Sequence, residues 1–257
     1  MDLFDLTGKQ ALVTGGAQGL GRMMAEGLLK AGASVAISSR KAEAAEAAAA
    51  EMSALGKVTA FAADLSTPEA ATELAARYTA EIGKLDILVN NAGKTWGAPV
   101  ESFPDKAWPG VMTINVQVPF TLVRELLPLL KASGSKFDPA RIVNIGSIAS
   151  AKVTGLHAYS YSASKAAILM VTRELAADLV KHHITANAIL PGWFPTRMSS
   201  HLHSEGEFDA ATLATIPMGR GGKPEDIAGG LIYLCSRAGA YVTGIQLPID
   251  GGVIGCS

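Results

Sequence analysis

Short runs of apolar, often β-branched residues alternate along the chain with longer stretches that have helical periodicity. The runs predicted to be strands lie at 9–14, 34–38, 57–64, 85–90, 140–147, 185–190 and 245–250. Strands that alternate with helices are typical of βαβ units, whose strands pair in parallel. The pattern therefore predicts an α/β fold, a doubly wound seven-stranded parallel sheet with helices on both of its faces.

One stretch interrupts this regular pattern. Residues 192–216 are irregular in sequence and contain Trp193, Phe194, two histidines and two glutamates. A long connection of this kind inside a compact α/β fold is usually functional. We expect a single domain over residues 1–257, because neither an internal repeat nor a linker interrupts the chain, and we expect residues 192–216 to form a lid over the substrate site.

The composition indicates an oligomer. Hydrophobic residues make up 49% of the 257 residues and charged residues only 18%, whereas globular chains usually have about 25% charged residues. The helical stretches near 110–130 and 155–180 and the final strand are more apolar than one core requires. We therefore expect other subunits to cover part of the surface, in a homotetramer or, failing that, a homodimer.

Charge and targeting signals argue against several classes of partner. The formal net charge of −1 gives no electrostatic footprint for nucleic acid or for an anionic membrane. No apolar run approaches the roughly 20 residues of a membrane helix, and the N-terminus lacks the basic and apolar regions of a signal peptide. Cys235 and Cys256 have neither metal-ligand spacing nor a disulfide pattern, so we expect one buried and one C-terminal thiol. These features predict a cytoplasmic protein without a metal.

A glycine-rich segment, TGGAQGLG at 14–21, follows the first predicted strand. The spacing G-x-G-x-x-G fails because Met24 occupies the last position, and the Gly-Lys-Ser/Thr of a P-loop is missing. The glycine pattern that the sequence does contain is G-x-x-x-G-x-G, at Gly15, Gly19 and Gly21. Glycines between a strand and a helix permit a tight turn and let a diphosphate approach the helix N-terminus. We expect a dinucleotide site, with a plain strand-to-helix turn as the alternative if the glycines are taken alone.

Two tyrosines precede a lysine in YSYSASK, residues 159–165. On a helix Tyr161 and Lys165 stand at positions i and i+4 and share a face, whereas Tyr159 lies on a largely opposite side. An ammonium about 4 Å from the tyrosine would lower its pKa by about three units from ~10, at an effective dielectric of about 20. Ser147 ends the fifth predicted strand, where open parallel sheets bind ligands. We therefore predict that Tyr161, not Tyr159, exchanges protons with a substrate.

Several motifs occur in one order along the chain. They are Thr14-Gly-x-x-x-Gly-x-Gly21, Asp64, NNAG (90–93), Asn115, Ser147, Tyr161-x-x-x-Lys165 and PGWFPT (191–196). In this order and at these separations they resemble the short-chain dehydrogenase/reductase family over essentially the whole chain. The resemblance implies a Rossmann-type fold and an oxidoreductase that moves hydride between a nicotinamide dinucleotide and a ketone or secondary alcohol.

The resemblance also implies roles for individual residues. Ser147 would orient the substrate carbonyl, and Tyr161 would donate or take the proton. Lys165 would lower the tyrosine pKa and hold the nicotinamide ribose, and Asn115 would support a water relay. From the motifs and the resemblance together, the residues expected to contact the cofactor are Gly15, Gln18, Gly19, Leu20, Gly21, Ser39, Arg40, Asp64 (at the adenine), Leu65, Asn91, Ala92, Gly93, Tyr161, Lys165, Pro191, Gly192, Phe194 and Thr196 (at the carboxamide).

One spacing departs from the family pattern. Ser147 and Tyr161 are one position farther apart than is common in the family, whereas Ser147 and Tyr159 would be one position closer. The spacing from Ser147 therefore does not decide between the two tyrosines. The position of Lys165, on the same helical face as Tyr161, favours Tyr161. This additional residue, with PGWFPTRM, IPMGR and GAYVTG, makes the chain similar to the 3-oxoacyl reductases of rhamnolipid biosynthesis, a subgroup of the family.

The end of the second predicted strand indicates the cofactor. NAD-preferring sites place an Asp or Glu there, about 20 residues past the glycine loop, to hold the ribose 2′-hydroxyl. This sequence instead reads SSRK at 38–41, and the first acid is Glu43. Arg40 offers a planar fork of donors to a 2′-phosphate and Ser39 adds a hydroxyl, so we predict NADP(H). The alternatives are that Arg40 points to solvent, and that selectivity is weak because Gln18 stands where some NADP enzymes have a second basic residue.

Other functions stay open at this point. An NAD-dependent alcohol or polyol dehydrogenase would use the same catalytic residues. A non-catalytic dinucleotide sensor would not need Ser147, Tyr161 and Lys165 together. A halohydrin-dehalogenase-like lyase would carry arginine at the lysine position and lack the glycine loop.

The remaining polar and apolar candidates concern the substrate. His182, His183, His201 and His203 have no accompanying ligand set, so we expect them to be solvated. His157 either edges the pocket or starts the helix. Within residues 192–216 the apolar side chains favour an acyl, cyclic or steroid-like ketone over a small sugar; they are Trp193, Phe194, Met198 and Leu202.

Overall fold

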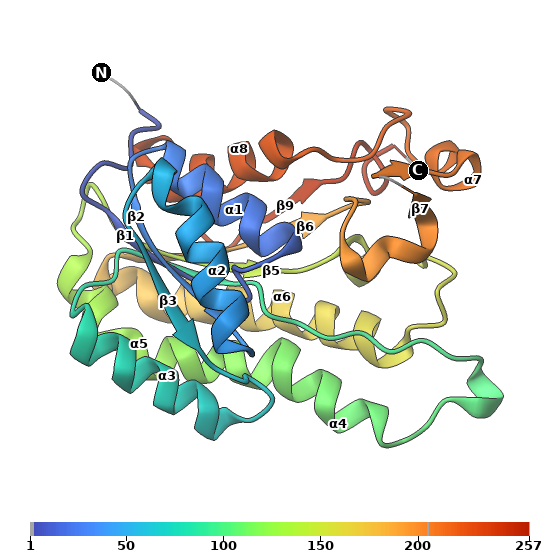
Figure 1. The fold of residues 1–257 in the computed structure, drawn as a ribbon, viewed down its shortest axis with the longest axis horizontal. Helices are drawn as coiled ribbons and strands as arrows, with labels where there is room; N and C mark the ends of the chain where they lie inside the picture. The colour runs from blue at the N-terminus through green and yellow to red at the C-terminus, as the bar shows by residue number, and fades with distance from the viewer. Residues whose placement is uncertain (1–2, 205, 257) are drawn as a thin grey trace.

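The predicted strands form one sheet in the computed structural model, which describes residues 3–204 and 206–256 (Figure 1). The strands of this sheet are β1 (Gln10–Val13), β2 (Ser34–Ser39), β3 (Val58–Ala62), β4 (Ile87–Asn90), β5 (Ala140–Ile145), β6 (Ile184–Pro191) and β9 (Gln246–Ile249). All are parallel, in the order β3-β2-β1-β4-β5-β6-β9. The prediction of a doubly wound α/β fold is confirmed.

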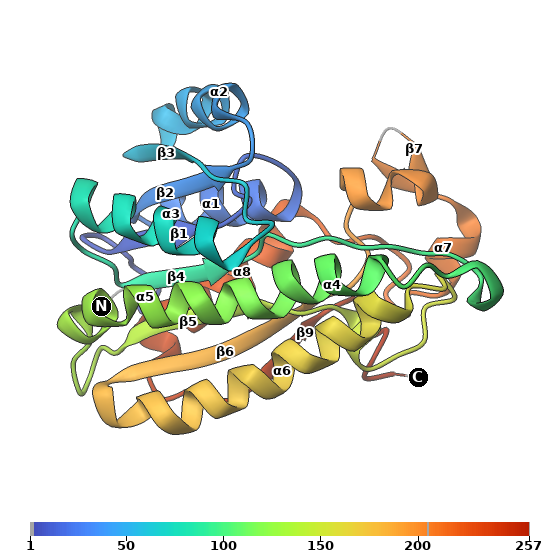
Figure 2. The same ribbon diagram turned by 90° about the horizontal axis from the view of Figure 1, so that it is seen from below.

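Helices cover both faces of the sheet (Figure 2). One face carries α1 (Gly19–Lys30), α2 (Ala42–Met52) and α8 (Pro224–Cys235), and the other carries α3 (Pro68–Glu81), α5 (Val118–Ser133) and α6 (Tyr159–Leu179). The shorter elements are α4 (Ala107–Met112), α7 (Ala210–Ala214), the antiparallel hairpin of β7 (His203–Ser204) and β8 (Glu207–Phe208), a π-helical turn at Thr113–Gln117, and 3₁₀ turns at Ser53–Leu55, Val100–Ser102, Ile148–Ser150, Val180–His182, Arg197–Leu202 and Arg237–Gly239.

Strand β1 shows why the sequence forms a sheet between two cores. Ala11 and Val13 are buried in the core under α1, α2 and α8, whereas Leu12, between them, is buried in the core under α3, α5 and α6. Side chains on a strand alternate between its two faces. A strand that is covered on both sides must therefore be apolar at every position, which explains the continuous apolar runs in the sequence.

The strand order brings two loops together at the carboxyl edge of the sheet. β1 pairs with β2 on one side and with β4 on the other, so the direction of chain progression reverses at β1. The loops that follow the strands on either side of such a switch point form a crevice in which α/β proteins bind ligands. The glycine segment after β1 and the NNAG segment after β4 therefore lie side by side.

Residues 192–216 are more regular than predicted, because they contain a 3₁₀ turn, the β7–β8 hairpin and α7. The ring of His203 packs edge-on against Phe208, with ring centroids 5.5 Å apart, and its Nε2 lies 3.0 Å from the carbonyl oxygen of Thr196. The prediction that His203 is solvated is therefore wrong, because the hairpin half-buries its ring. The side chain of His201 lies outside the described part of the structure.

The two cysteines differ in exposure. Cys235 is buried and Cys256 is exposed, and both are free thiols, as the sequence predicts. Among the described residues, no group of three or more His, Cys, Asp or Glu side chains is arranged to hold a metal ion. Over the same ranges, the helices are all too short or too polar to cross a membrane.

Candidate active site

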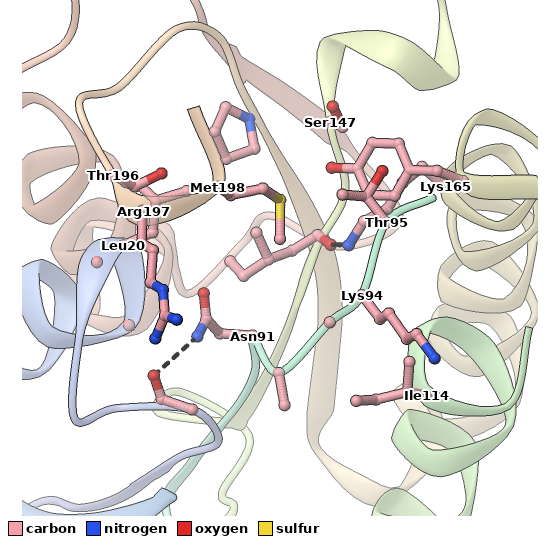
Figure 3. A pocket seen from close by; sticks show the side chains of 18 of the residues that line it. Leu20, Asn91, Lys94, Thr95, Ile114, Ser147, Lys165, Thr196, Arg197 and Met198 are labelled. Carbon is pink, nitrogen blue, oxygen red and sulfur yellow. Dashed lines mark hydrogen bonds between the residues drawn. The ribbon is translucent and has the colours of Figure 1, made fainter. Parts of the chain in front are cut away.

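A cavity of about 720 Å³ opens at the carboxyl ends of the strands, between the glycine segment and the start of residues 192–216 (Figure 3). Every residue predicted to contact the cofactor lines this cavity, and so does Ser147. Pockets for cofactors and small ligands typically measure about 300–1,000 Å³. The fold thus brings the predicted site residues into one place, with the exception of Asn115.

The glycine segment leaves the start of α1 free for an anion. Gly15 and Gly19 have positive φ angles of 65° and 55°, and a Cβ at Gly21 would overlap the carbonyl oxygen of Gly15. Gln18, at the helix N-cap, makes no side-chain capping hydrogen bond, and the first turn carries no acidic residue. The first N–H groups of α1 are therefore available to a ligand, and the helix dipole favours a negative one.

The segment after β4 holds the glycine segment in position. The Oγ1 of Thr14 accepts hydrogen bonds from the backbone N–H groups of Asn91 (2.9 Å) and Ala92 (3.0 Å). The side-chain amide of Asn91 donates to the carbonyl oxygens of Thr14 (2.8 Å) and Gly15 (3.3 Å). Because these bonds join the two loops directly, the cradle at the start of α1 is formed by the protein itself.

The end of β2 presents a cation and no carboxylate. Ser38, Ser39 and Arg40 line the cavity there, and Arg40 is exposed. Within the described residues no ion pair engages Arg40. The hydroxyl of Ser38 is buried without a hydrogen-bond partner in the same ranges. This end of the cavity therefore has unused donors, as a binding site for a phosphate requires.

The whole cavity carries an excess of positive charge. Among the described residues, Asp64 is the one acid that lines it. The cations that line it are Arg40, Lys94, Lys165 and Arg197. This excess of positive charge favours an anionic ligand in the cavity.

Ser147 lies just past the end of β5, on the catalytic side of the cavity. Its Oγ accepts a 3.1 Å hydrogen bond from the backbone N–H of Ala149, which caps the following 3₁₀ turn and fixes the hydroxyl. Figure 3 shows Ser147 and Lys165 on the same side of the cavity, across from Thr196 and Leu20. The residues expected to meet the substrate carbonyl therefore face the residues expected to hold the cofactor.

Lys165 does not act on Tyr161 in the predicted way. Its Nζ donates a 2.6 Å hydrogen bond to the carbonyl oxygen of Ile145 and lies 5.7 Å from the centroid of the Tyr161 ring. Burial lowers the pKa of Lys165 to about 8. Burial raises the pKa of Tyr161, and a hydrogen bond with Ser147 opposes that shift. The prediction that Lys165 lowers the tyrosine pKa is wrong for this structure, because desolvation dominates and the ammonium turns to a backbone carbonyl.

Tyr159 lies outside the cavity, whereas Tyr161 lines it. The side chain of Tyr159 is 39% exposed, and its ring packs edge-on against Phe103 at 5.3 Å. His157 is exposed, has a φ of 48° and lies with its ring 6.5 Å from that of Tyr159. Because His157 does not line the cavity, the structure favours its interpretation as a residue that starts the helix.

Asn115 lies behind the wall of the cavity, in the π-helical turn, and is 2% exposed. Its Oδ1 accepts from the N–H of Lys94 (2.9 Å), and its Nδ2 donates to the carbonyl oxygen of Lys94 (2.9 Å). The same Nδ2 donates to the Oγ of Ser164 (2.8 Å), which donates to the carbonyl oxygen of Tyr161 (2.7 Å). Asn115 thus supports the backbone on both sides of the cavity, and its part in a water relay stays a prediction.

Ser164, Arg197 and Lys94 are among the site residues that the sequence analysis missed. Ser164 stands three positions after Tyr161 on a helix, a spacing at which a hydroxyl reaches the backbone carbonyl of the preceding turn, so a signal was present. Arg197 directly follows the predicted cofactor residue Thr196. Lys94 likewise directly follows the predicted cofactor residue Gly93.

Comparison with known proteins identifies the family. A family model described as Enoyl-(Acyl carrier protein) reductase matches residues 15–254. The chain belongs to the short-chain dehydrogenase/reductase family. It is 49% identical to the rhamnolipids biosynthesis 3-oxoacyl-(acyl-carrier-protein) reductase of Pseudomonas aeruginosa, over 97% of each chain. It is 34% identical to the gluconate 5-dehydrogenase of Gluconobacter oxydans, over 98% of this chain and 97% of that protein.

Solved structures of the family have the same fold. The active-site complex of Pseudomonas aeruginosa RhlG with NADP matches with a TM-score of 0.93 and 47% identity, over 98% of this chain and 99% of that chain. A gluconate 5-dehydrogenase from Burkholderia cenocepacia J2315, in complex with NADP and tartrate, matches with a TM-score of 0.87 and 31% identity, over 98% and 97%. The resemblance to the short-chain family and to its rhamnolipid-related reductases is confirmed.

Proposed function

We propose that this protein is an NADP(H)-dependent oxidoreductase that reduces a ketone to a secondary alcohol or catalyses the reverse reaction. The observation that carries the proposal is that Ser147, Tyr161 and Lys165 line the same cavity as the anion cradle at the start of α1. A dinucleotide sensor would not need these three side chains in one cavity. The presence of Lys165 and of the glycine segment also argues against a halohydrin-dehalogenase-like lyase.

The cavity fits NADP(H), which supplies or accepts the hydride when bound. The N–H groups at the start of α1 would hold the diphosphate, Arg40 and Ser39 the 2′-phosphate, and Asp64 the adenine. A carboxylate at the end of β2 would repel a 2′-phosphate, and SSRK contains none. Two relatives with the same fold were solved in complex with NADP. These complexes support NADP(H) over NAD(H) as the cofactor.

Tyr161 is the proton donor in the reduction. Because burial raises its pKa, the hydroxyl is protonated at neutral pH, as a general acid must be. The hydroxyl of Ser147 donates to the carbonyl oxygen of the ketone and so places that oxygen beside Tyr161. In the oxidation Tyr161 must first lose its proton, so we expect the oxidation to need a higher pH than the reduction.

The walls around the catalytic residues favour an apolar ketone. Ile114, Leu156, Trp193 and Met198 line the cavity, and buried apolar surface on a substrate stabilises its complex. A 3-oxoacyl compound or a cyclic ketone fits these walls, and the similarity to the 3-oxoacyl reductase of Pseudomonas aeruginosa supports the first of these.

A sugar-acid ketone is the second candidate. Relatives named gluconate 5-dehydrogenase have the same fold, and Lys94, which lies beside Ile114 in Figure 3, offers a cation to a carboxylate. A 3-oxoacyl thioester has no carboxylate at the corresponding end. Replacing Lys94 should therefore weaken binding of the sugar acid and leave binding of the thioester unchanged.

The domain organisation and the oligomeric state of the protein are also proposals. We infer a single domain in which residues 192–216 close over the cavity as a lid, because their first residues line it. We infer a homotetramer or, failing that, a homodimer, since Phe120 on α5 and Met170 on α6 are 46% and 54% exposed. Light scattering at micromolar concentration tests the assembly, and the mass of a monomer would contradict it.

The experiment that tests the proposed function is a panel of ketones assayed by the consumption of NADPH. The panel contains 3-oxoacyl thioesters, cyclic ketones and 5-ketogluconate, each with Tyr161→Phe as the control for background oxidation. We expect turnover of at least one class by the parent enzyme. Tight NADPH binding without turnover of any ketone would favour a sensor, and equal use of NADH would favour an NAD-dependent dehydrogenase.

A further inference from the structure

Arg197 is a cation of the cavity for which the proposed reaction has no use. It directly follows Thr196 at the start of the proposed lid, lines the cavity and is exposed. In residues 3–204 and 206–256, no hydrogen bond or ion pair engages its guanidinium. Arg197 therefore has a charge that no described side chain compensates.

The start of the lid lies directly over the glycine segment. The Cβ and Cγ2 of Thr196 are 3.6 Å from the position that a Cβ would take at Gly19. In Figure 3 the side chain of Arg197 extends from the lid toward Asn91, whose amide donates to the carbonyl oxygen of Gly15. The guanidinium is thus directed toward the cradle at the start of α1 and away from Ser147.

The cradle itself has no side-chain cation. Residues 15–21 are Gly, Gly, Ala, Gln, Gly, Leu and Gly. The next residue, Arg22, forms ion pairs with Glu26 at 2.8 Å and with Glu51 at 2.6 Å, so its charge is already compensated. A diphosphate at the cradle would therefore meet backbone N–H groups but no cation from the glycine segment.

The other three cations that line the cavity lie away from the cradle at the start of α1 or bind another group. Arg40 lies at the end of β2, where the 2′-phosphate is expected. Lys165 donates to the carbonyl oxygen of Ile145, and Lys94 lies beside Ile114 on a different wall (Figure 3). Of the four cations that line the cavity in the described part of the chain, Arg197 is the one directed toward the cradle.

We propose that Arg197, at the start of the proposed lid, is a ligand of the cofactor diphosphate. The inference rests on the proposed function, because it requires NADP(H) in this cavity. An arginine fork pairs with phosphate oxygens through two parallel hydrogen bonds. The dipole and free N–H groups of α1 hold the other side of the same group.

The test separates the two kinds of phosphate with two probes. Adenosine 2′-monophosphate carries the 2′-phosphate without a diphosphate, and NADP⁺ carries both. Their dissociation constants are measured by calorimetry for the parent protein, Arg197→Ala, Arg197→Lys, Arg40→Ala and Lys94→Ala. Lys94→Ala is the matched control, because it removes one exposed cation of the same cavity from a different wall.

Arg197→Ala should weaken NADP⁺ binding roughly ten- to a hundredfold, the scale of a charge-assisted contact, and leave adenosine 2′-monophosphate binding unchanged. Arg197→Lys should retain part of the affinity. Arg40→Ala should weaken both probes, and Lys94→Ala neither. Unchanged binding of the smaller probe also shows that the variant is folded.

Two further outcomes separate the inference from the proposed function. If the parent binds NADP⁺ and Arg197→Ala binds it equally well, or loses both probes equally, the inference is overturned and the proposed function stands. If the parent binds neither NADP⁺ nor adenosine 2′-monophosphate, the proposed function fails, and this inference fails with it.

Discussion

The Nζ of Lys165 donates a 2.6 Å hydrogen bond to the carbonyl oxygen of Ile145, the last residue of β5. This bond ties α6, which carries Tyr161, to the strand that leads into Ser147. A buried ammonium thus holds together the two elements whose hydroxyls are expected to meet the substrate. Its burial also lowers its pKa to about 8, which has a consequence for stability.

Lys165 should reduce the stability of the cofactor-free protein at neutral pH. The folded chain releases the lysine proton near pH 8, whereas the unfolded chain keeps it up to the ordinary pKa of 10.5. Between these values the unfolded state binds the additional proton, so the free energy of unfolding rises with pH. Relative to Lys165→Met, the parent should gain about 2–3 kcal/mol from neutral pH to pH 10.5. Urea unfolding at both pH values measures this gain, and a pH-independent difference contradicts it.

Ser164 should matter although it does not line the cavity. Ser164→Ala removes the acceptor of Asn115 and the donor to the carbonyl oxygen of Tyr161. We expect a loss of about 1–3 kcal/mol in the free energy of unfolding and a lower kcat, with the Kd for NADPH nearly unchanged. Ser162→Ala, on the same helix, is the matched control and should change neither quantity. If the two variants behave equally in urea unfolding and steady-state kinetics, the hydrogen bonds of Ser164 to Asn115 and Tyr161 do not contribute to stability or catalysis.

The preference for NADPH should follow Ser39 and Arg40. Charge-assisted contacts of about 1.5–3 kcal/mol imply a preference for NADPH over NADH of roughly ten- to a hundredfold. Ser39→Asp/Arg40→Ala should reverse it, because a carboxylate repels the 2′-phosphate and accepts from a ribose 2′-hydroxyl. The measurement is kcat/KM for both cofactors with one ketone. Equal values in the parent, or a preference that the double change does not move, would show that Arg40 is not the phosphate ligand.

The fold followed from the sequence because its two-sided core leaves a simple pattern. A residue such as Leu12, whose strand neighbours face the opposite core, must be apolar, so each strand reads as one continuous run. The β7–β8 hairpin was not predicted, because two paired residues per strand are too few to produce a pattern. For the same reason the half-burial of His203 against Phe208 could not be predicted from the sequence.

The candidate site was predicted where local geometry determines it. The shared helical face of Tyr161 and Lys165 follows from their spacing, and the exposed position of Tyr159 agrees with it. The direction of the Tyr161 pKa shift could not be predicted from the sequence, because it depends mainly on how far the folded chain buries the phenol. The direction of Arg197 was equally inaccessible, since it depends on how residues 192–216 pack over the glycine segment.

The most direct test of the account compares Tyr161→Phe and Tyr159→Phe in the reduction of one ketone by NADPH, with kcat measured alongside the Kd for NADPH. Tyr161→Phe should lower kcat at least ~10²-fold, the scale of general acid–base catalysis, with NADPH binding largely retained. Tyr159→Phe should keep most of the activity, because its ring packs on Phe103 outside the cavity. A fully active Tyr161→Phe, or an inactive Tyr159→Phe, would contradict the account.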